Sequence, residues 1–107
     1  GLGRAEGLDL TRPDTLSVLG SLDGPFDVVL MATGILAPPG GQPEKRLAAV
    51  TPDGMAQVMA VNAIGPALVL GQVARLLPKE SRSVVGVLSA RVGSIGDNDL
   101  GGWHSYR

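Results

Sequence analysis

Small and polar side chains gather at three places in the chain where a hydrophobic core would not need them. The first is Asp9, the second is the run from Ala32 to Gly34, and the third is the run from Ser89 to Ser94. Carboxylate and hydroxyl groups can hydrogen-bond a ligand, and missing side chains let it approach the backbone. The chain has no cysteine, and its single histidine, His104, does not suffice for a zinc site. We therefore expect a polar binding site but no metal site and no disulfide framework.

Each of these places follows a segment that the sequence predicts to be a strand. Gly7 to Leu10 is typical of the end of a buried strand, while Phe26 to Ala32 and Ser83 to Ser89 are almost continuously apolar. Such apolar runs favour parallel strands that are covered on both faces. In open parallel sheets, ligands bind beyond the carboxyl ends of the strands. We therefore expect the site at that edge of the sheet.

The segments between the predicted strands carry helix signals. Pro13 lies in the first turn of a short helix, and Thr51 to Asp53 combines a hydroxyl cap, a proline at the first helical position and an acid near the positive end of the dipole. The second helix is predicted to end near Leu77. Thr33 to Val50 is a Gly- and Pro-rich loop at the mouth of the site, and Trp103 to Arg107 begins another helix. This alternation indicates an α/β fold with a parallel sheet and right-handed crossovers.

The long helix is unusual because Asn62 is its only polar side chain between Val58 and Leu70. A helix that is apolar all round is expected to be buried on more than one side. Pro66 has no N–H, so the backbone carbonyl of Asn62 loses its helical partner, and we expect the helix to bend there.

Length and charge narrow the class of protein. The 107 residues suffice for one small domain, and a net charge of -1 with scattered basic residues provides no field for nucleic acid or an anionic membrane. The chain opens without a signal sequence. The apolar run Val58 to Leu70 is too short to span a bilayer. These features predict a cytoplasmic protein without nucleic-acid or membrane partners.

At the positions described above, the sequence resembles the short-chain dehydrogenase/reductase family over essentially the whole chain. The similar motifs are Asp9-Leu10-Thr11, Met31-Ala32-Thr33-Gly34, Asn62-Ala63-Ile64-Gly65, Ser89-Ala90-Arg91-Val92-Gly93-Ser94 and Tyr106. The stretch from Gly93 to Arg107 is most similar to the C-factor-like, carbonyl-reductase-related branch. The resemblance implies a partial Rossmann-like, doubly wound parallel sheet in three αβα layers. It also implies that residues 1–107 form a single incomplete NAD(P)-binding domain, without the first strands, the Gly-rich loop and the C-terminal part.

The resemblance assigns catalytic roles. Tyr106 would protonate the substrate carbonyl, and a nearby cation has to favour its ionised form because a free phenol is a weak acid at neutral pH. Asn62 would hold a water that relays protons. Ser89 and Ser94 compete to supply the hydroxyl that holds the substrate oxygen, and Ser94 is favoured because its loop can swing toward Tyr106. The plain alternatives are an ordinary helix tyrosine and serines that bond their own backbone.

The resemblance also assigns cofactor contacts. Asp9 would accept a hydrogen bond from the adenine amino group, with Leu10 beside it. Thr33 and Gly34 would pass close to the cofactor ribose, next to Ala32. The plain alternatives are helix capping by Asp9 and a simple strand-to-loop turn at residues 32–34. Trp103 and His104 receive no role.

Four departures from the family pattern limit these roles. No Gly-rich phosphate loop follows a strand, and the family lysine would fall three residues past Arg107. Ala32 stands where the family has a structural Asn, and Ala90 stands where it has the catalytic Ser. We therefore expect the 107-residue chain alone to be inactive.

Two classes of function remain open. The first is a fragment of an NAD(P)-dependent oxidoreductase that transfers a hydride between the nicotinamide cofactor, NAD or NADP, and a carbonyl or secondary alcohol. The alternative is a non-catalytic relative that binds a nucleotide or serves in signalling, which Ala32 and Ala90 favour. A third reading is a folding fragment with no activity. The resemblance also implies a homo-oligomer formed through the helix at residues 52–77.

Overall fold

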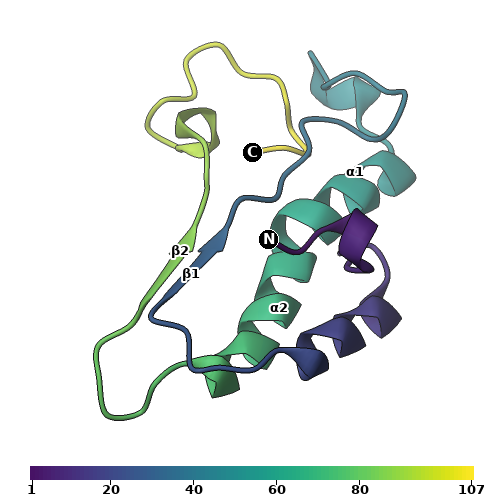
Figure 1. The fold of residues 1–107 in the computed structure, drawn as a ribbon. Helices are drawn as coiled ribbons and strands as arrows, with labels where there is room; N and C mark the ends of the chain where they lie inside the picture. Colours follow the sequence, from purple (N-terminus) through teal and green to yellow (C-terminus); the bar gives the residue numbers. More distant parts are fainter.

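The computed structural model describes all residues from 1 to 107, and its centre is a two-stranded parallel sheet beside one long helix (Figure 1). Strands β1 (Val28–Met31) and β2 (Val84–Val87) pair in parallel, with Val28 opposite Val84. The predicted strands at 26–32 and 83–89 and their parallel pairing are therefore confirmed. Short 3-10 helices complete the chain: η1 (Arg4–Glu6), η2 (Pro13–Ser21), η3 (Leu47–Ala49), η5 (Ala74–Leu76) and η6 (Arg91–Gly93).

The long helix begins and ends close to the predicted residues. It comprises α1 (Pro52–Met59), a π-helical segment η4 (Ala60–Ile64), α2 (Gly65–Val73) and then η5. At its start, the Thr51 hydroxyl oxygen accepts from the backbone N–H of Gly54 at 3.2 Å, as the capping signal predicts.

The helix is irregular just before Pro66. In the π-helical segment, the N–H of Gly65 donates to the carbonyl of Ala60, five residues back. Pro66 cannot donate to the carbonyl of Asn62, so a regular ladder cannot pass through this point. The disturbance that Pro66 predicts is thus met by a π-helical turn, one of the ways in which helices absorb a break in their ladder.

One side of this helix is buried, and the other is exposed. The buried side is formed by Val58, Val61, Gly65, Pro66, Val69, Val73 and Leu76. On other sides, Met59, Ile64 and Leu68 are exposed. The expectation that the helix is buried on more than one side is therefore wrong for this structure.

By length and composition alone, the 25-residue helix from Pro52 to Leu76 meets the requirement for crossing a membrane, since an 18-residue window within it has a mean hydropathy of 1.4. The apolar run from Val58 to Leu70, predicted to be too short to span a bilayer, is the central part of this longer helix. Core helices of soluble proteins meet the same requirement, and this helix packs against η2 and β1.

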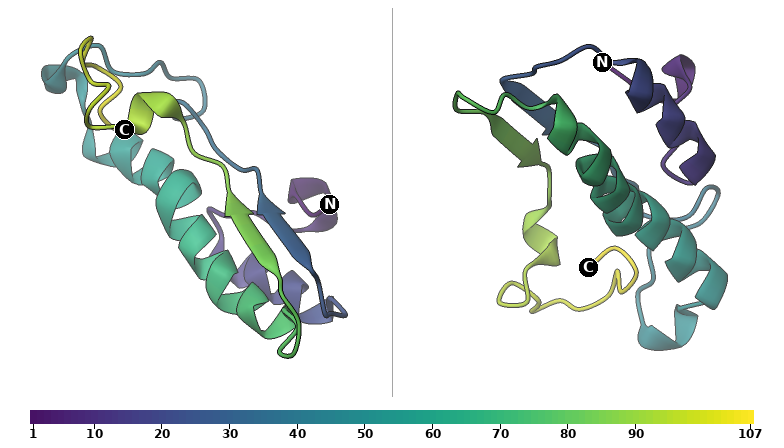
Figure 2. Two further views of the ribbon diagram at one scale, coloured as in Figure 1. Left: turned by 90° about the vertical axis from the view of Figure 1, so that its left-hand side faces the viewer. Right: turned by 90° about the horizontal axis from the view of Figure 1, so that it is seen from below.

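The core lies between β1, η2 and α2. Its buried members are Leu19, Met31, Val69, Val73 and Leu76. The helices η2 and α2 lie on the same face of the sheet, as Figure 2 shows. The molecule is only 18 Å deep along its shortest axis. Its radius of gyration of 15.9 Å exceeds the ~13 Å of a compact domain of about this length. The predicted α/β fold is confirmed, but the structure has two layers instead of the three that we expected.

Two predicted elements are absent. Gly7 to Leu10 is not a strand, because the sheet contains only β1 and β2 and this segment has no strand beside it to pair with. Trp103 to Arg107 forms one turn, closed by the N–H of Arg107 and the carbonyl of Trp103 at 2.9 Å, and no helix. Trp103 has a φ of 52°, in the left-handed region, which a right-handed helix cannot contain.

Candidate functional site

A cavity of about 570 Å³ lies beyond the carboxyl ends of β1 and β2, where the sequence places the site. Four parts of the chain line it: the turn after β1, the middle of the long helix, the segment after β2 and the last three residues. The polar side chains in its wall are those of Thr33, Asn62, Ser89, Ser105, Tyr106 and Arg107. Ala32, Gly34, Ala63, Ala90 and Gly93 are also in the wall, and their small size leaves the space open.

Asn62 joins the long helix to the turn after β1. Its side-chain oxygen accepts from the N–H of Ile35 at 2.8 Å, and its side-chain NH2 donates to the carbonyl of Ile35 at 2.8 Å. These paired bonds hold the backbone next to Gly34 against the helix. The one polar side chain in the apolar part of the helix therefore fixes the shape of the cavity wall.

Of the two candidate serines, only one lines the cavity. Ser89 is in the wall together with Ala90, because it lies two residues after the end of β2. Ser94 follows the short helix η6, where its N–H donates to the carbonyl of Arg91 at 2.9 Å, and it is not in the wall.

Tyr106 is held beside the cavity by the segment that precedes it. Its ring packs edge-to-face on Trp103, with ring centroids 6.2 Å apart. Ser105 is buried, and its N–H donates to the carboxylate of Glu44 at 3.3 Å while its hydroxyl donates to the same carboxylate. The hydrogen bond from the Ser105 hydroxyl is the main reason why the pKa of Glu44 lies below its ordinary value.

Arg107, in the cavity wall, bonds the backbone of the two segments that precede Tyr106. Its guanidinium donates to the backbone carbonyls of Gly102 at 2.8 Å and Gly101 at 3.3 Å, and to the carbonyl of Val92. An arginine can bond several carbonyls at once because its donors form a rigid fork. It thereby ties η6 to the turn that precedes Tyr106.

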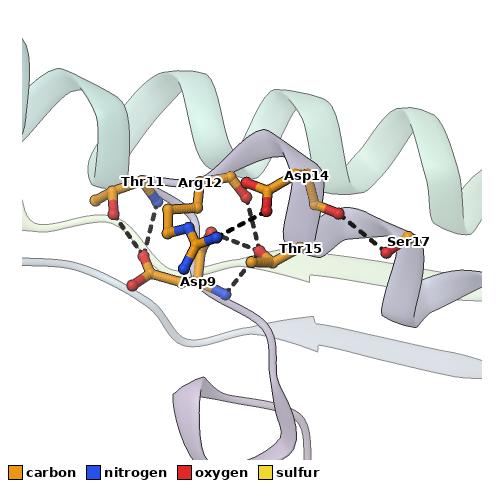
Figure 3. Close-up of polar contacts among 6 residues, drawn as sticks. All are labelled: Asp9, Thr11, Arg12, Asp14, Thr15 and Ser17. Carbon is orange, nitrogen blue, oxygen red and sulfur yellow. Dashed lines mark hydrogen bonds and ion pairs between the residues drawn. The ribbon is translucent and has the colours of Figure 1, made fainter.

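Asp9 is not in the cavity wall but forms a hydrogen-bonded group with η2 (Figure 3). Its carboxylate accepts from the N–H of Thr11 at 2.9 Å and from the Thr11 hydroxyl at 2.6 Å, and it pairs with Arg4 at 3.1 Å. The Thr15 hydroxyl bonds the backbone of Asp9 and of Arg12.

The bonds at Asp9 affect its ionisation. The hydrogen bonds from Thr11, first from its hydroxyl and then from its backbone, hold the pKa of the Asp9 carboxyl below its ordinary value. Leu10 also lies outside the cavity wall and packs against the core. The structure therefore brings Ala32, Thr33, Gly34, Asn62, Ser89 and Tyr106 together, but it leaves Asp9, Leu10 and Ser94 outside this cavity.

Sequence reasoning did not find Glu44 or Arg107. Glu44 lies in the Gly- and Pro-rich loop, and its partner Ser105 is 61 residues away, so no local pattern links them. The only sequence signal for Arg107 is that it directly follows the candidate Tyr106.

Comparisons with known proteins agree with this geometry at the level of fold. No protein-family model matches the chain, and no curated protein matches it. Two solved structures from Burkholderia multivorans, each 30% identical, do match. One, described as a short-chain dehydrogenase/reductase with bound NADP, has a TM-score of 0.78, and the other, described as a short-chain alcohol dehydrogenase, has a TM-score of 0.76. A carbonyl reductase from Pseudomonas aeruginosa PAO1, 20% identical, shares the fold with a TM-score of 0.73.

The matches cover most of this chain but less than half of each relative. Each Burkholderia structure covers 94% of this chain, which spans 42% and 44% of their lengths, and the Pseudomonas structure covers 92%, with the chain spanning 42% of it. The predicted resemblance is confirmed: the chain has the fold of a section of a short-chain dehydrogenase/reductase.

Proposed function

We propose that this chain forms the nicotinamide side of the active site of an NAD(P)-dependent oxidoreductase that acts on a carbonyl or secondary alcohol. The observation that carries the proposal is the cavity at the carboxyl edge of the sheet, which gathers Asn62, Ser89 and Tyr106 around the small residues 32–34. The chain spans 42% of the Burkholderia relative that was crystallised with NADP. We propose accordingly that it acts as an incomplete domain within a larger enzyme and is inactive alone.

The residues present fit one end of such a cofactor. A cavity of about 570 Å³ lies in the usual size range of ligand pockets, and its small side chains leave the turn backbone accessible. Gly34 has only the Asn62 side-chain oxygen near it, at 3.6 Å from where a Cβ would lie. When bound, NAD or NADP would supply the hydride. Thr33 and Gly34 would lie against its ribose, and Asp9 and Leu10 would serve its adenine end.

The chain's own residues would handle the proton. The Tyr106 hydroxyl would donate a proton to the substrate carbonyl oxygen, and the hydroxyl of Ser89 would hydrogen-bond the same oxygen. The position of Ser89 in the cavity wall supports it over Ser94. Asn62 would hold the proton-relaying water through its backbone carbonyl, since both ends of its side-chain amide are bonded to Ile35.

A non-catalytic nucleotide-binding or signalling relative is the second candidate. The observation that favours it is Ala90, a cavity-wall residue without a hydroxyl at the position where the family pattern has its serine. In either case we expect a cytoplasmic protein that associates through the exposed side of the helix at 52–77, where Met59, Ile64 and Leu68 are exposed.

Binding is tested on the chain itself with half-cofactors. Nicotinamide mononucleotide should give saturable NMR shifts at Gly34, Ser89 and Tyr106, because it needs only the nicotinamide side of the site. AMP at the same concentration is the matched control and should leave those signals in place. The proposal fails if nicotinamide mononucleotide shifts none of the cavity residues.

Catalysis is tested in the protein that carries the complete domain, by NADPH oxidation with an aromatic aldehyde. Tyr106→Phe should lower kcat by about 10²- to 10⁴-fold, the range for loss of a general acid. Ser89→Ala should lower it by about 10²- to 10³-fold, and Ser94→Ala should leave it unchanged. Absence of turnover in a protein that binds NADPH would favour the non-catalytic candidate.

A further inference from the structure

The segment that carries Tyr106 has almost no regular structure of its own, yet it is held in a strained conformation. Gly101, Gly102 and Trp103 have φ values of 64°, 72° and 52°. The left-handed region is open to glycine but costs a residue such as Trp roughly 1–2 kcal/mol. Such a conformation persists only where surrounding groups fix it.

Two residues hold it: Arg107, which bonds the carbonyls of Gly101 and Gly102, and Glu44, which bonds the two residues nearer to Tyr106. The backbone carbonyl of Glu44 accepts from the N–H of Trp103, and its carboxylate accepts from both the N–H and the hydroxyl of Ser105. The fit is close, because a Cβ on Gly102 would lie 3.1 Å from the Glu44 carbonyl oxygen. Glu44, in the loop after β1, therefore bonds both Ser105, next to Tyr106, and the strained Trp103.

We propose that Glu44 is a positioning residue for Tyr106: it fixes the 101–105 segment so that the phenol lies in the cavity wall. The proposal rests on the proposed function for its catalytic consequence, but the placement of the ring is a property of the chain alone. Glu44 does not line the cavity, so it acts through Ser105 and Trp103 and does not touch the substrate.

The chemistry of the contact requires a carboxylate. Ser105 presents two donors, and two carboxylate oxygens accept them without competition. A glutamine would offer one oxygen, and its NH2 would face a donor. Glu44→Gln should therefore loosen the segment more than Glu44→Asp, which keeps the carboxylate and shortens its reach.

The chain offers a direct probe, because Trp103 is its only tryptophan and Tyr106 its only tyrosine. With ring centroids 6.2 Å apart, energy absorbed by Tyr106 passes efficiently to Trp103. In Glu44→Gln, the transfer should fall and Trp103 emission should move to longer wavelength. Ser105→Ala removes the hydroxyl that donates to Glu44, so it should also lower the energy transfer and move Trp103 emission to longer wavelength. Glu80→Gln, the same change at an exposed glutamate of the 79–82 turn, is the matched control and should match the unchanged chain.

The second readout separates positioning from general stability. In the protein with the complete domain, Glu44→Gln should lower kcat by about 10- to 100-fold with little change in KM, as expected for a misplaced catalytic group. Glu44→Asp should show a smaller loss of kcat than Glu44→Gln, and Glu80→Gln should show no loss of kcat. Far-UV circular dichroism checks that each variant is folded, and Ser105→Ala replaces Glu44→Gln if the latter does not fold.

Two results would overturn the proposal: unchanged transfer and emission in Glu44→Gln, or changed fluorescence with unchanged kcat. If the unchanged enzyme shows no turnover at all, the proposed function fails, while the fluorescence still decides whether Glu44 places the ring.

Discussion

Asn62 shows how one side chain can shape a site without being free to bind a ligand. Both polar ends of its amide are bonded to the backbone of Ile35. Any contribution to ligand chemistry must therefore come from its backbone or from the turn that it holds. The only polar side chain in an apolar stretch of helix is explained by this bridge, since a partly buried amide needs partners.

Removal of this bridge should be costly. Asn62→Ala leaves the N–H and the carbonyl of Ile35 without their partners and should lower the free energy of unfolding by about 1–3 kcal/mol. Urea unfolding measures the loss. Gln72→Ala, at an exposed position of the same helix, should change stability by less than about 0.5 kcal/mol. Equal effects of the two substitutions would contradict the bridging role.

The Asp9 group predicts a pH dependence. Its carboxyl pKa is lowered in the folded chain, so its contribution to stability is present above the ordinary value of 3.8 and is lost as the pH falls through the lower folded value. Thr11→Val removes the hydroxyl donor but keeps the backbone N–H, and it should move the pKa of Asp9 up toward 3.8. NMR titration of the carboxyl carbon measures the shift.

Ser17→Ala is the control for this titration, because the Ser17 hydroxyl on the same helix bonds the carbonyl of Asp14 and does not contact Asp9 (Figure 3). The stability difference between Thr11→Val and the unchanged chain should disappear at pH values well below 3.8. A difference that persists there would show that Thr11 acts through packing instead.

At the residue scale, the sequence predicted six of the 15 residues in the cavity wall, but not the contacts that hold them in place. Ala32 to Gly34, Asn62 and Ser89 meet because they lie just after the strands or in the middle of the long helix, whose positions the parallel sheet determines, whereas Tyr106 reaches the cavity from an irregular segment. Glu44 could not be predicted, because its contact with Ser105 joins two irregular segments and leaves no periodic signal. Which of the two serines lines the cavity also depends on where η6 turns the chain, and the sequence does not show this.

At the element scale, the sequence correctly predicted those helices and strands whose own residues carry a clear signal. The cap at Thr51 and the proline at position 52 set the start of the long helix, and both apolar runs became strands. The prediction of a strand at Gly7 to Leu10 failed because a strand also needs a neighbour, and Leu8 and Leu10 pack on the core instead. Sequence patterns cannot show which neighbours are present.

Gly65 predicts how closely the long helix and the N-terminal segment approach each other. A Cβ at this position would lie 2.6 Å from the Cβ of Leu10 and 2.8 Å from the carbonyl oxygen of Ala60. Gly65→Ala should therefore force the two segments apart and destabilise the chain by about 1–3 kcal/mol. Thermal or urea unfolding tests this.

The same helix provides a matched substitution, Gly71→Ala, with the opposite expected effect on stability. A Cβ at Gly71 meets nothing within 4 Å. Gly71→Ala should then stabilise by about 0.5–1 kcal/mol, because alanine loses less backbone entropy in a helix. If both substitutions stabilise the chain, the contact between Gly65 and Leu10 does not limit the packing.

At the scale of the whole molecule, the sheet is covered on one face only. Val28 and Leu30 of β1 are 69% and 64% exposed, and Val84, which pairs with Val28, is 57% exposed. Because paired residues of a parallel ladder point to the same side, these side chains form one apolar surface opposite the helices. Apolar faces and unpaired strand edges favour association with other chains.

This surface predicts self-association that depends on the sheet. Leu30→Lys places a charge in the middle of the open face and should shift sedimentation-velocity profiles toward the monomer at concentrations where the unchanged chain associates. Leu100→Lys changes an equally apolar residue that is 98% exposed in a loop, and it should have no such effect. Leu68→Lys introduces the same charge on the exposed side of the long helix, the surface through which we expect the homo-oligomer to form. If only Leu68→Lys dissociates the complex, the helix is the interface and the open sheet face is not; if only Leu30→Lys does so, the sheet face drives association of this chain.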